Sequence, residues 1–439
     1  MAALPSGHVA SNCPASARGC PDWWAAAGAL HRFVADLVAD EVAHLRPGGA
    51  ALPPRPWSAD LRLDGDGLGL DSLELLSVAA ALNETLHLYE SGIEDLLLAR
   101  RSVGDWVSLA AEGLQHFSAR LTFRTSGSSG QPKPCTHELA HLQQEVVHLG
   151  ALLAGRRRVL SAVPAHHIYG FLLTVLLPER LACGPALDVR SATPQALPQR
   201  LQAGDLLVSH PTHWALVARH ASALPAGVHG VTSTAPCPDE LAQALAGNGL
   251  QRLLQVYGSS ETAGIGWRDA PHSPYQLMPQ WQRDAADAAT LVRIAADGVR
   301  WPHSLQDRIE WLADGQFRVL GRLDAAVQVG GINVFPERVR QALLAHPAVH
   351  DAAVRPMAAH EGQRLKAFIV PAPGADPAAL RDELARWLSD RLSAPEQPKA
   401  FTFGTALPVN QRGKACDWPI RCDEIDVNPT HLTTDSSLA

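Results

Sequence analysis

The sequence predicts a multidomain protein: an N-terminal bundle of about four helices, a layered α/β domain, and a small α+β domain at the C-terminus. Three observations predict this. The length of 439 residues is about three times that of an ordinary domain. Hydrophobic residues make up 46% of the chain, which is enough to build real cores. The apolar pattern then changes from helical spacing in residues 25–115 to strand-like runs that alternate with helices in residues 119–323.

The first unit, residues 25–115, follows a leader, residues 1–24, that is rich in Pro, Gly, Ser and Ala. Apolar residues at spacings of three and four predict a helix over Ala25–Leu45. A loop rich in Pro and Gly separates it from three further helical stretches. These are Leu73–Leu86, Ile93–Ala99 and Val103–Leu114.

The α/β domain begins with a short strand at Leu121–Arg124. Further strand-like runs are Arg158–Val163, Leu206–Ser209, Gly230–Ser233 and Leu253–Tyr257. Their alternation with helices predicts layers around a sheet. Residues 324–422 read as helix, two strands, helix and strand, and the polar tail, residues 423–439, is expected to be disordered.

The composition excludes several functional classes. Lys and Arg number 37 against 44 Asp and Glu, so the net charge is −7, and without a basic stripe nucleic-acid binding is not expected. The longest apolar runs, such as Ile168–Leu177, fall short of the ~20 residues of a membrane span. Met1–Gly19 lacks the features of a secretion signal. The seven cysteines form no Cys-x-x-Cys pair, which fits a reducing, cytoplasmic setting without a zinc site or disulfide framework.

A loop rich in Ser and Gly, Thr125–Lys133, is the most informative segment of the chain. Its glycines allow close approach of the backbone to a phosphate, and its hydroxyls and lysine supply donors and positive charge. It lacks the Gly-Lys pair of a Walker loop. A flexible turn is the alternative interpretation.

Further motifs follow this loop in the order found in one known family. They are Pro164–Gly170 (Pro-Ala-His-His-Ile-Tyr-Gly), Ser233–Pro236, Tyr257–Thr262 (Tyr-Gly-Ser-Ser-Glu-Thr), Asp307, Gly321–Asp324 and Leu407–Lys414. Together with the Ser/Gly loop, this ordered set resembles the adenylate-forming superfamily of acyl-CoA synthetases, non-ribosomal adenylation domains and luciferases. The resemblance covers residues 121–416. It implies an adenylation (AMP-binding) domain in residues 119–323 and a mobile lid domain in residues 324–422.

The resemblance also implies roles for individual residues. The ATP site would comprise Thr125, Ser126, Gly127, Ser128, Ser129, Gly130, Lys133, Ser233, Thr234, Ala235, Tyr257, Gly258, Ser260, Asp307 and Arg322. Tyr257 would stack on adenine, and Asp307 with Arg322 would hold the ribose. His167 would act in the acyl site, Glu261 would hold Mg²⁺, and Lys414 would contact the carboxylate and the α-phosphate. Taken singly, these charges could be surface residues, and His167 and Tyr257 could be core residues.

Two half-reactions are implied by the same resemblance. A carboxylate attacks the α-phosphate of ATP to give an acyl-adenylate and pyrophosphate. The lid then rotates about a hinge near Asp324, withdraws Lys414 and presents another face for attack by a thiol. In relatives the segment Gly330–Val334 belongs to that thioester-forming face; a plain β-turn is the alternative interpretation.

The helical unit contains the segment Leu68–Leu76, with the order Asp71-Ser72-Leu73. This segment resembles the signature of acyl and peptidyl carrier proteins, in which the serine carries a 4′-phosphopantetheine arm added by a phosphopantetheinyl transferase. The resemblance implies a carrier-like domain with its arm on Ser72. Asp71 and Ser72 could instead cap a helix, and the unit could be an unmodified relic.

Compared with full-length relatives, the adenylation domain looks trimmed on its N-terminal side, where the carrier-like unit stands. Three functional hypotheses remain: a ligase that loads an acyl group onto Ser72's arm, a ligase that uses coenzyme A or a separate carrier, and a non-catalytic scaffold in a polyketide-like or pigment pathway. The stretch around His167, Tyr169, Phe171, His213 and Trp214 is aromatic enough for a small aryl acid, with a medium-chain fatty acid nearly as plausible.

Overall fold

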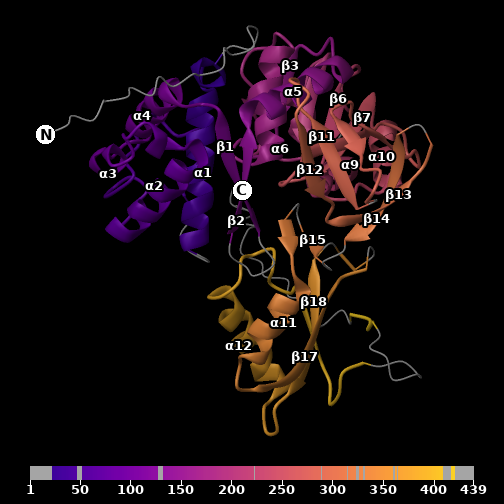
Figure 1. Cartoon of the computed structure of the whole chain (residues 1–439). Helices are drawn as coiled ribbons and strands as arrows, with labels where there is room; N and C mark the ends of the chain where they lie inside the picture. Colours follow the sequence, from indigo (N-terminus) through magenta and orange to yellow (C-terminus); the bar gives the residue numbers. More distant parts are fainter. Residues whose placement is uncertain are drawn as a thin grey trace, which may run out of the picture.

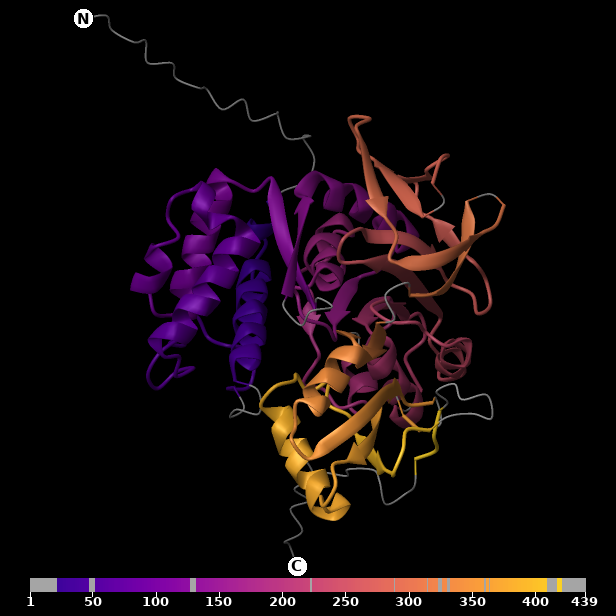
Figure 2. The same cartoon turned by 60° about the horizontal axis from the view of Figure 1, so that its bottom comes forward.

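The computed structural model describes residues 22–46, 52–126, 132–221, 223–287, 289–313, 315–322, 326–329, 332–358, 361–362, 364–408 and 417–420. Three parts are visible in Figures 1 and 2: a helical unit, a sheet-centred domain, and a small C-terminal domain that lies beneath both in the view of Figure 1. Within the described residues, no helix is long and apolar enough to cross a membrane.

Four α-helices form the helical unit: α1 (Ala29–Leu45), α2 (Ser72–Leu86), α3 (Leu96–Ala99) and α4 (Val103–His116). The start of α2 is fixed by a capping box. The Asp71 carboxylate accepts from the backbone N–H groups of Leu73 (2.8 Å) and Glu74 (2.9 Å), and the Glu74 carboxylate accepts from the Asp71 N–H. Ser102 and Asp105 start α4 in the same way.

The helical unit is not a separate body, because its core continues into the sheet-centred domain. Phe171 of that domain packs against Trp23 and Phe33, with ring centroids 5.0 and 5.7 Å apart, and against Phe123 at 5.5 Å. One cluster of buried residues runs from Trp23 to Phe317. Trp23 stands at the end of the stretch expected to be a loose leader, yet only 1% of it is exposed, because it fills this aromatic cluster.

A nine-stranded sheet organises the α/β domain, in the order β13-β14-β9-β8-β7-β6-β5-β3-β4. The strands from β7 to β4 in this order run parallel, and the remaining neighbours pair antiparallel. In chain order they are β3 (Arg158–Ser161), β4 (Leu187–Asp188), β5 (Asp205–Ser209), β6 (His229–Thr232), β7 (Arg252–Ser259), β8 (Ala263–Arg268), β9 (Tyr275–Leu277), β13 (Asp307–Trp311) and β14 (Gln316–Arg322). The layered α/β prediction is therefore confirmed.

Other elements surround this sheet. A hairpin of β1 (Arg120–Ser126) and β2 (Pro132–Glu138) stands between it and the helical unit (Figure 1). A separate three-stranded sheet follows β9 in the chain and contacts β8 and α5 (Leu139–Leu152). Its strands are β10 (Trp281–Arg283), β11 (Thr290–Ile294) and β12 (Arg300–Ser304). The helices of the domain are α5 (Leu139–Leu152), α6 (Ile168–Phe171), α7 (Leu177–Arg180), α8 (Leu197–Arg200), α9 (Pro211–His220) and α10 (Asp239–Gly247).

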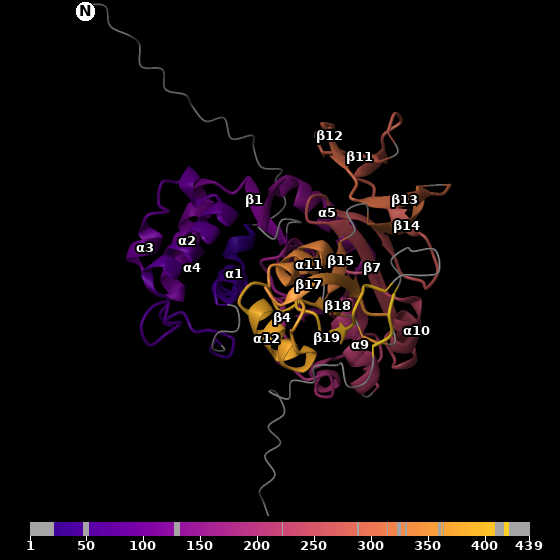
Figure 3. The same ribbon diagram turned by 90° about the horizontal axis from the view of Figure 1, so that it is seen from below.

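The C-terminal domain has a core of its own, as predicted for a small α+β unit. A hairpin leads into a three-stranded sheet covered by two helices. The elements are β15 (Val327–Val329), β16 (Ile332–Val334), α11 (Pro336–Leu344), β17 (Val349–Pro356), β18 (Leu365–Pro371), α12 (Pro377–Ser389) and β19 (Ala400–Phe403). Seen from below, this domain stands in front of the α/β domain, with the helical unit to one side and β11–β14 to the other (Figure 3).

Candidate active site

The parallel strands bring three of the predicted motifs to one edge of the sheet. Parallel strands place their carboxyl ends at the same edge, where open α/β sheets bind ligands. Pro164–Gly170 follows β3, His213 follows β5, Ser233–Ala235 follows β6, and Glu261 follows β7. Segments up to about a hundred residues apart in the chain thus meet at one site.

The Ser/Gly loop is the tip of the β1–β2 hairpin. Thr125 pairs with Lys133 and Ser126 with Pro132, so both ends of the loop are held by strand pairing. Lys133 is exposed. The tip itself, residues 127–131 with the predicted Gly127, Ser128, Ser129 and Gly130, lies outside the described residues.

Strand β2 ties this hairpin to the turn that carries Glu261. The buried His137 ring donates from Nε2 to the Ser260 carbonyl oxygen, 2.6 Å away. Burial lowers the pKa of His137 to about 4, so the ring is neutral. Burial and the Glu261 carboxylate raise the pKa of Cys135 to about 11, while the Lys133 ammonium acts in the opposite direction. The predicted phosphate lysine and magnesium carboxylate therefore both lie near one buried thiol.

The turn between β7 and β8 is tight. A Cβ on Gly258 would lie 2.0 Å from the Ala263 carbonyl oxygen, so only glycine fits there. The Ser259 N–H donates to the Thr262 hydroxyl at 3.2 Å and closes the turn. Glu261 stands in this turn, half-buried. A carboxylate in this turn would suit Mg²⁺, which prefers oxygen ligands.

Tyr257, Asp307 and Arg322 form a second cluster across three strands. The Tyr257 hydroxyl donates to Asp307 Oδ2 at 2.6 Å, and Arg322 Nε lies 3.9 Å from Asp307 Oδ1. Burial, with the Asp307 charge, raises the pKa of Tyr257, so its hydroxyl stays a donor. The Tyr257 ring packs at 5.5 to 5.7 Å from the rings of Phe317 and Tyr275. Residues predicted as adenine and ribose contacts are thus brought together.

Thr234, in the predicted adenine-lining segment, has an unusual backbone. Its φ is +75°, a conformation that β-branched residues rarely adopt. Its hydroxyl is buried without a hydrogen-bond partner in the described part of the chain. Strain of this kind gathers at functional sites, so the turn after β6 is a candidate ligand contact.

The predicted acyl segment is a sharp turn that leads into α6. A Cβ on Gly170 would lie 1.8 Å from the Pro164 carbonyl oxygen. His167 precedes α6 and is exposed at the surface, although burial among the surrounding protein atoms lowers the pKa of its ring to about 3. The buried Tyr169 hydroxyl donates to the Ser209 carbonyl at 2.8 Å, and His213 Nδ1 lies 2.7 Å from Ser209 Oγ.

Two residues of the expected aromatic pocket belong to the core instead. Phe171 is 0% exposed because it joins the shared aromatic cluster, and Trp214 is 0% exposed because its ring packs over Gly230. The Trp214 Nε1–H donates to the buried Val231 carbonyl at 3.2 Å. The aromatic richness of this stretch therefore reflects packing in part.

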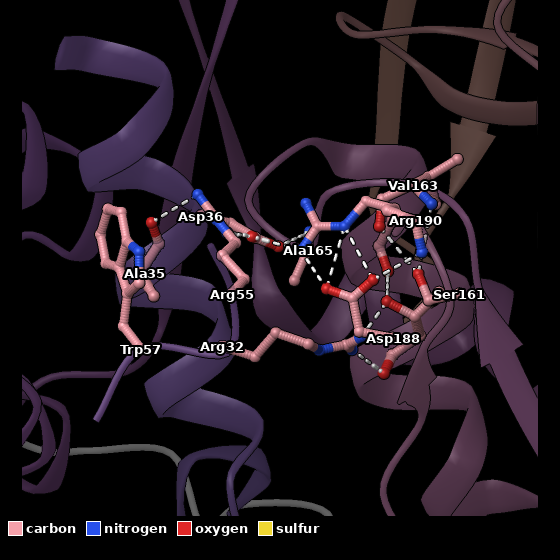
Figure 4. Close-up of polar contacts among 12 residues, drawn as sticks. Arg32, Ala35, Asp36, Arg55, Trp57, Ser161, Val163, Ala165, Asp188 and Arg190 are labelled. Atoms are coloured by element: carbon pink, nitrogen blue, oxygen red, sulfur yellow. Dashed lines mark hydrogen bonds and ion pairs between the residues drawn. The ribbon is translucent and has the colours of Figure 1, made fainter. Parts of the chain in front are cut away.

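A charged network on α1, which was not predicted from the sequence, contacts the acyl segment (Figure 4). The buried Asp36 carboxylate accepts from the Ala165 N–H and from Arg190 Nη2, both at 2.7 Å, and from Arg55. One turn later, Asp40 Oδ2 lies 3.3 Å from His166 Nε2. The sequence offered one signal for this network. It was the presence of two acids, spaced by four, on a helix face that is otherwise apolar and carries Phe33, Val34 and Leu37.

Asp40, His166 and His167 also lie close enough to hold a metal ion. Each offers one ligand atom, and these atoms lie within 4.8 Å of one another. His166 Nε2 lies 3.3 Å from Asp40 Oδ2, and neither ring nitrogen of His166 makes a hydrogen bond within the described part of the chain.

Some predicted site residues lie outside the described part of the chain: Lys414 and Asp324, with Gly330 and Gly331 of the thioester segment. Ser72, the predicted attachment site of the phosphopantetheine arm, lies within the described residues. It is the first residue of α2, and its side chain is exposed.

A layered α/β domain with these strand-end motifs, followed by a small α+β domain, defines an AMP-forming acid–thiol ligase. The chain matches the AMP-binding enzyme family over residues 112–287 and the AMP-binding enzyme C-terminal domain over residues 339–414. It is 40% identical to a 4-coumarate–CoA ligase of Halorhodospira halophila, over 87% of this chain and 97% of that one. It is 39% identical to a 4-coumarate–CoA ligase of Rhodobacter capsulatus, over 89% of this chain and 100% of that one. The chain therefore belongs to the AMP-binding enzymes.

Solved structures agree on the fold. An amide bond synthetase, McbA, of Marinactinospora thermotolerans matches with a TM-score of 0.55 at 17% identity, over 88% of this chain and 92% of that one. A malonyl-CoA ligase matches with a TM-score of 0.53 at 22% identity, over 66% and 71%. At these identities the likeness concerns the fold alone.

Proposed function

We propose that this protein is an ATP-dependent ligase that joins a small aromatic acid, of the 4-coumarate type, to coenzyme A. The observation that carries the proposal is 39–41% identity to three 4-coumarate–CoA ligases, matched over at least 96% of their own lengths. The match to the Rhodobacter relative covers 89% of this chain. The residues that follow the helical unit make up a smaller share of the chain, so the match extends into the helical unit. Relatives named for free coenzyme A thus share part of that unit, which favours CoA over a carrier-bound acceptor.

In the first half-reaction, a carboxylate oxygen of the acid attacks the α-phosphorus of ATP, and pyrophosphate leaves. The Tyr257 ring would pack against adenine, and Asp307, oriented by Tyr257 and Arg322, would accept from a ribose hydroxyl. Lys133 and the loop from Thr125 to Gly130 would hold the phosphates. Glu261 would hold Mg²⁺, which offsets phosphate charge when it is bound.

In the second half-reaction, the CoA sulfur attacks the acyl carbonyl carbon, and AMP leaves with the bonding electron pair. The C-terminal domain would change its position about residues 323–325 between the two steps. Lys414 would serve only the first step, because it would offset charge between the carboxylate and the α-phosphate.

Exchange of labelled pyrophosphate into ATP tests the first step. The panel holds 4-coumarate, a hydroxybenzoate and a medium-chain fatty acid, with Lys414→Ala as the comparison. We expect 4-coumarate to give the fastest exchange, Lys414→Ala to lose it, and added CoA to give a thioester that mass spectrometry detects. If no acid gives exchange above the level of Lys414→Ala, the proposed function is wrong.

A second acceptor, a 4′-phosphopantetheine arm on Ser72, is supported by one feature of α2. Ser72 is exposed at the helix start, and two nearby apolar side chains on the helix, Leu73 and Leu76, are 75% and 50% exposed, whereas Leu75 is buried. Exposed leucines beside a serine suit recognition by another protein, such as a transferase. The same unit would then be a carrier domain.

Incubation with CoA and a broad-specificity phosphopantetheinyl transferase tests this acceptor. A mass gain of one arm that Ser72→Ala abolishes would support it, and acyl transfer to that arm without free CoA would favour it over CoA as the acceptor. An unmodified chain after complete modification of a control carrier protein would contradict it. Membership in the ligase family favours both enzyme hypotheses over a non-catalytic scaffold.

A further inference from the structure

We infer that helix α1 of the helical unit is a fixed wall of the acid-binding site, with Asp36 and Asp40 as positioning residues for the turn Pro164–Gly170. This inference rests on the proposed function, because it assigns the acid to the edge of the sheet where that turn lies. Asp36 and Asp40 belong to the helical unit and to none of the family motifs.

The turn lies where a ligand of the sheet would bind. It follows β3 directly, at the carboxyl edge shared with β5, β6 and β7. His167 projects from this turn and is exposed, whereas its neighbour Ala165 is fully buried. Whatever fixes the backbone at Ala165 therefore also sets the direction of the exposed His167 ring.

Asp36 fixes that backbone. Its side chain is 0% exposed, and its Oδ2 accepts the Ala165 N–H at 2.7 Å. Its other oxygen accepts from Arg55 and Arg190, so the buried charge is compensated by two guanidinium groups. Figure 4 shows the carboxylate between the two arginines, with Ala165 beside it.

Further contacts join the same two parts of the molecule. Arg190 also pairs with Asp188, the last residue of edge strand β4. Arg32, one turn before Asp36 on α1, donates to Thr174 on both its backbone carbonyl and its hydroxyl. Arg32, Asp36 and Asp40 are spaced by four, so one stripe of α1 meets the turn and its neighbours.

Asp40 contacts His166, the residue next to His167. Its carboxylate lies 3.3 Å from His166 Nε2, and the His166 ring centroid lies 4.1 Å from that of His167. Burial opposes the charged form of Asp40, but the neighbouring rings of His166, His167 and His44 together outweigh it and lower the pKa of Asp40. The charged carboxylate thus orients His166, and His166 limits the positions open to the His167 ring.

The α1 wall has a direct consequence for the reaction. Without the carboxylates of Asp36 and Asp40, the turn Pro164–Gly170 would shift relative to the ATP site. The contacts of these two carboxylates do not reach the ATP site itself. The KM for the acid should therefore rise while the KM for ATP stays constant. Misplacing a binding group by about an ångström can cost up to about a hundredfold, so we expect a rise of roughly tenfold.

The test compares Asp40→Asn, Asp40→Glu and Asp36→Asn in the full chain by pyrophosphate exchange. Glu41→Gln is the matched control. It makes the same acid-to-amide change on α1 and also removes an ion pair to the α/β domain, with Arg124, but it does not contact the turn. We expect Asp40→Asn to raise the KM for the acid, Asp40→Glu to restore most of it, and Glu41→Gln to leave it unchanged.

The outcomes separate the two proposals. If the wild-type protein exchanges pyrophosphate but Asp40→Asn, Asp36→Asn and Glu41→Gln all have the wild-type KM for the acid, the α1 inference is wrong and the proposed function stands. An equal rise in the KM for acid and ATP would also overturn it, because it would indicate a general loss of structure. If the wild-type protein exchanges with no acid, both proposals fail. Asp40 is partly exposed, so its variants remain informative if Asp36→Asn does not fold.

Discussion

At the level of single residues, the contact between Tyr257 and Asp307 gives the most direct test of the proposed ATP site. Asp307→Asn keeps the shape but removes the charge. A hydrogen bond to a charged group contributes about 1.5–3 kcal/mol, so we expect the KM for ATP to rise about tenfold or more. The KM for the acid should stay constant. Glu310→Gln, on the same strand but paired with Arg318 at the surface, is the control. An unchanged KM for ATP in Asp307→Asn would remove Asp307 from the site.

His137 should make the stability of the fold depend on pH. Its folded pKa is about 4 against 6.5 for an unperturbed histidine, so between these values the unfolded chain binds the extra proton. Stability is therefore complete above pH 6.5 and falls as the pH drops toward 4, by up to about 1.4 kcal/mol per pH unit from this residue. His137→Gln keeps a donor for Ser260 and does not titrate.

Urea unfolding at pH 7.5 and pH 5.5 measures this effect. The free energy of unfolding should fall less between the two values in His137→Gln than in the wild-type protein. His116→Gln changes an exposed histidine at the end of α4 and should keep the wild-type difference. Equal differences in all three proteins would mean that His137 is not held neutral in the fold.

At the level of elements, the capping box at the start of α2 should contribute measurably to the stability of the fold. Asp71→Ala leaves the N–H groups of Leu73 and Glu74 without their acceptor and should cost about 1 kcal/mol. We expect the melting temperature to fall by about 2–4 °C. Asp71→Asn keeps an acceptor and should lie close to the wild-type protein. An unchanged melting temperature in Asp71→Ala would show that the cap is not stabilising.

The same elements show what the sequence could and could not predict. The start of α2 depends on neighbours within a few residues, so the local pattern places it closely. The partner of Asp36, by contrast, is Arg190, 154 residues away. A local pattern cannot say which charge is buried or against what, because burial is decided by tertiary contacts. The buried positions of Phe171 and Trp214 were missed for the same reason.

At the level of the whole molecule, the cores predict which parts unfold together. The helical unit and the α/β domain share one cluster of buried residues that includes Phe33 and Phe171. The C-terminal domain has its own cluster, which includes Leu384 and shares no residue with the first. We therefore expect two calorimetric transitions, with the helical unit melting in the larger one.

Two core substitutions assign these transitions. Truncating a buried leucine costs about 2–5 kcal/mol and a buried phenylalanine about 3–5 kcal/mol. Leu384→Ala should lower the midpoint of the smaller transition alone, and Phe33→Ala that of the larger one alone. Phe33 belongs to the helical unit, so the size of the transition that it shifts shows whether this unit unfolds with the α/β domain. If Phe33→Ala instead separates a third, small transition, the helical unit is an independent body. It would then be free to move as a carrier domain does, and α1 could not act as a fixed wall of the acid site.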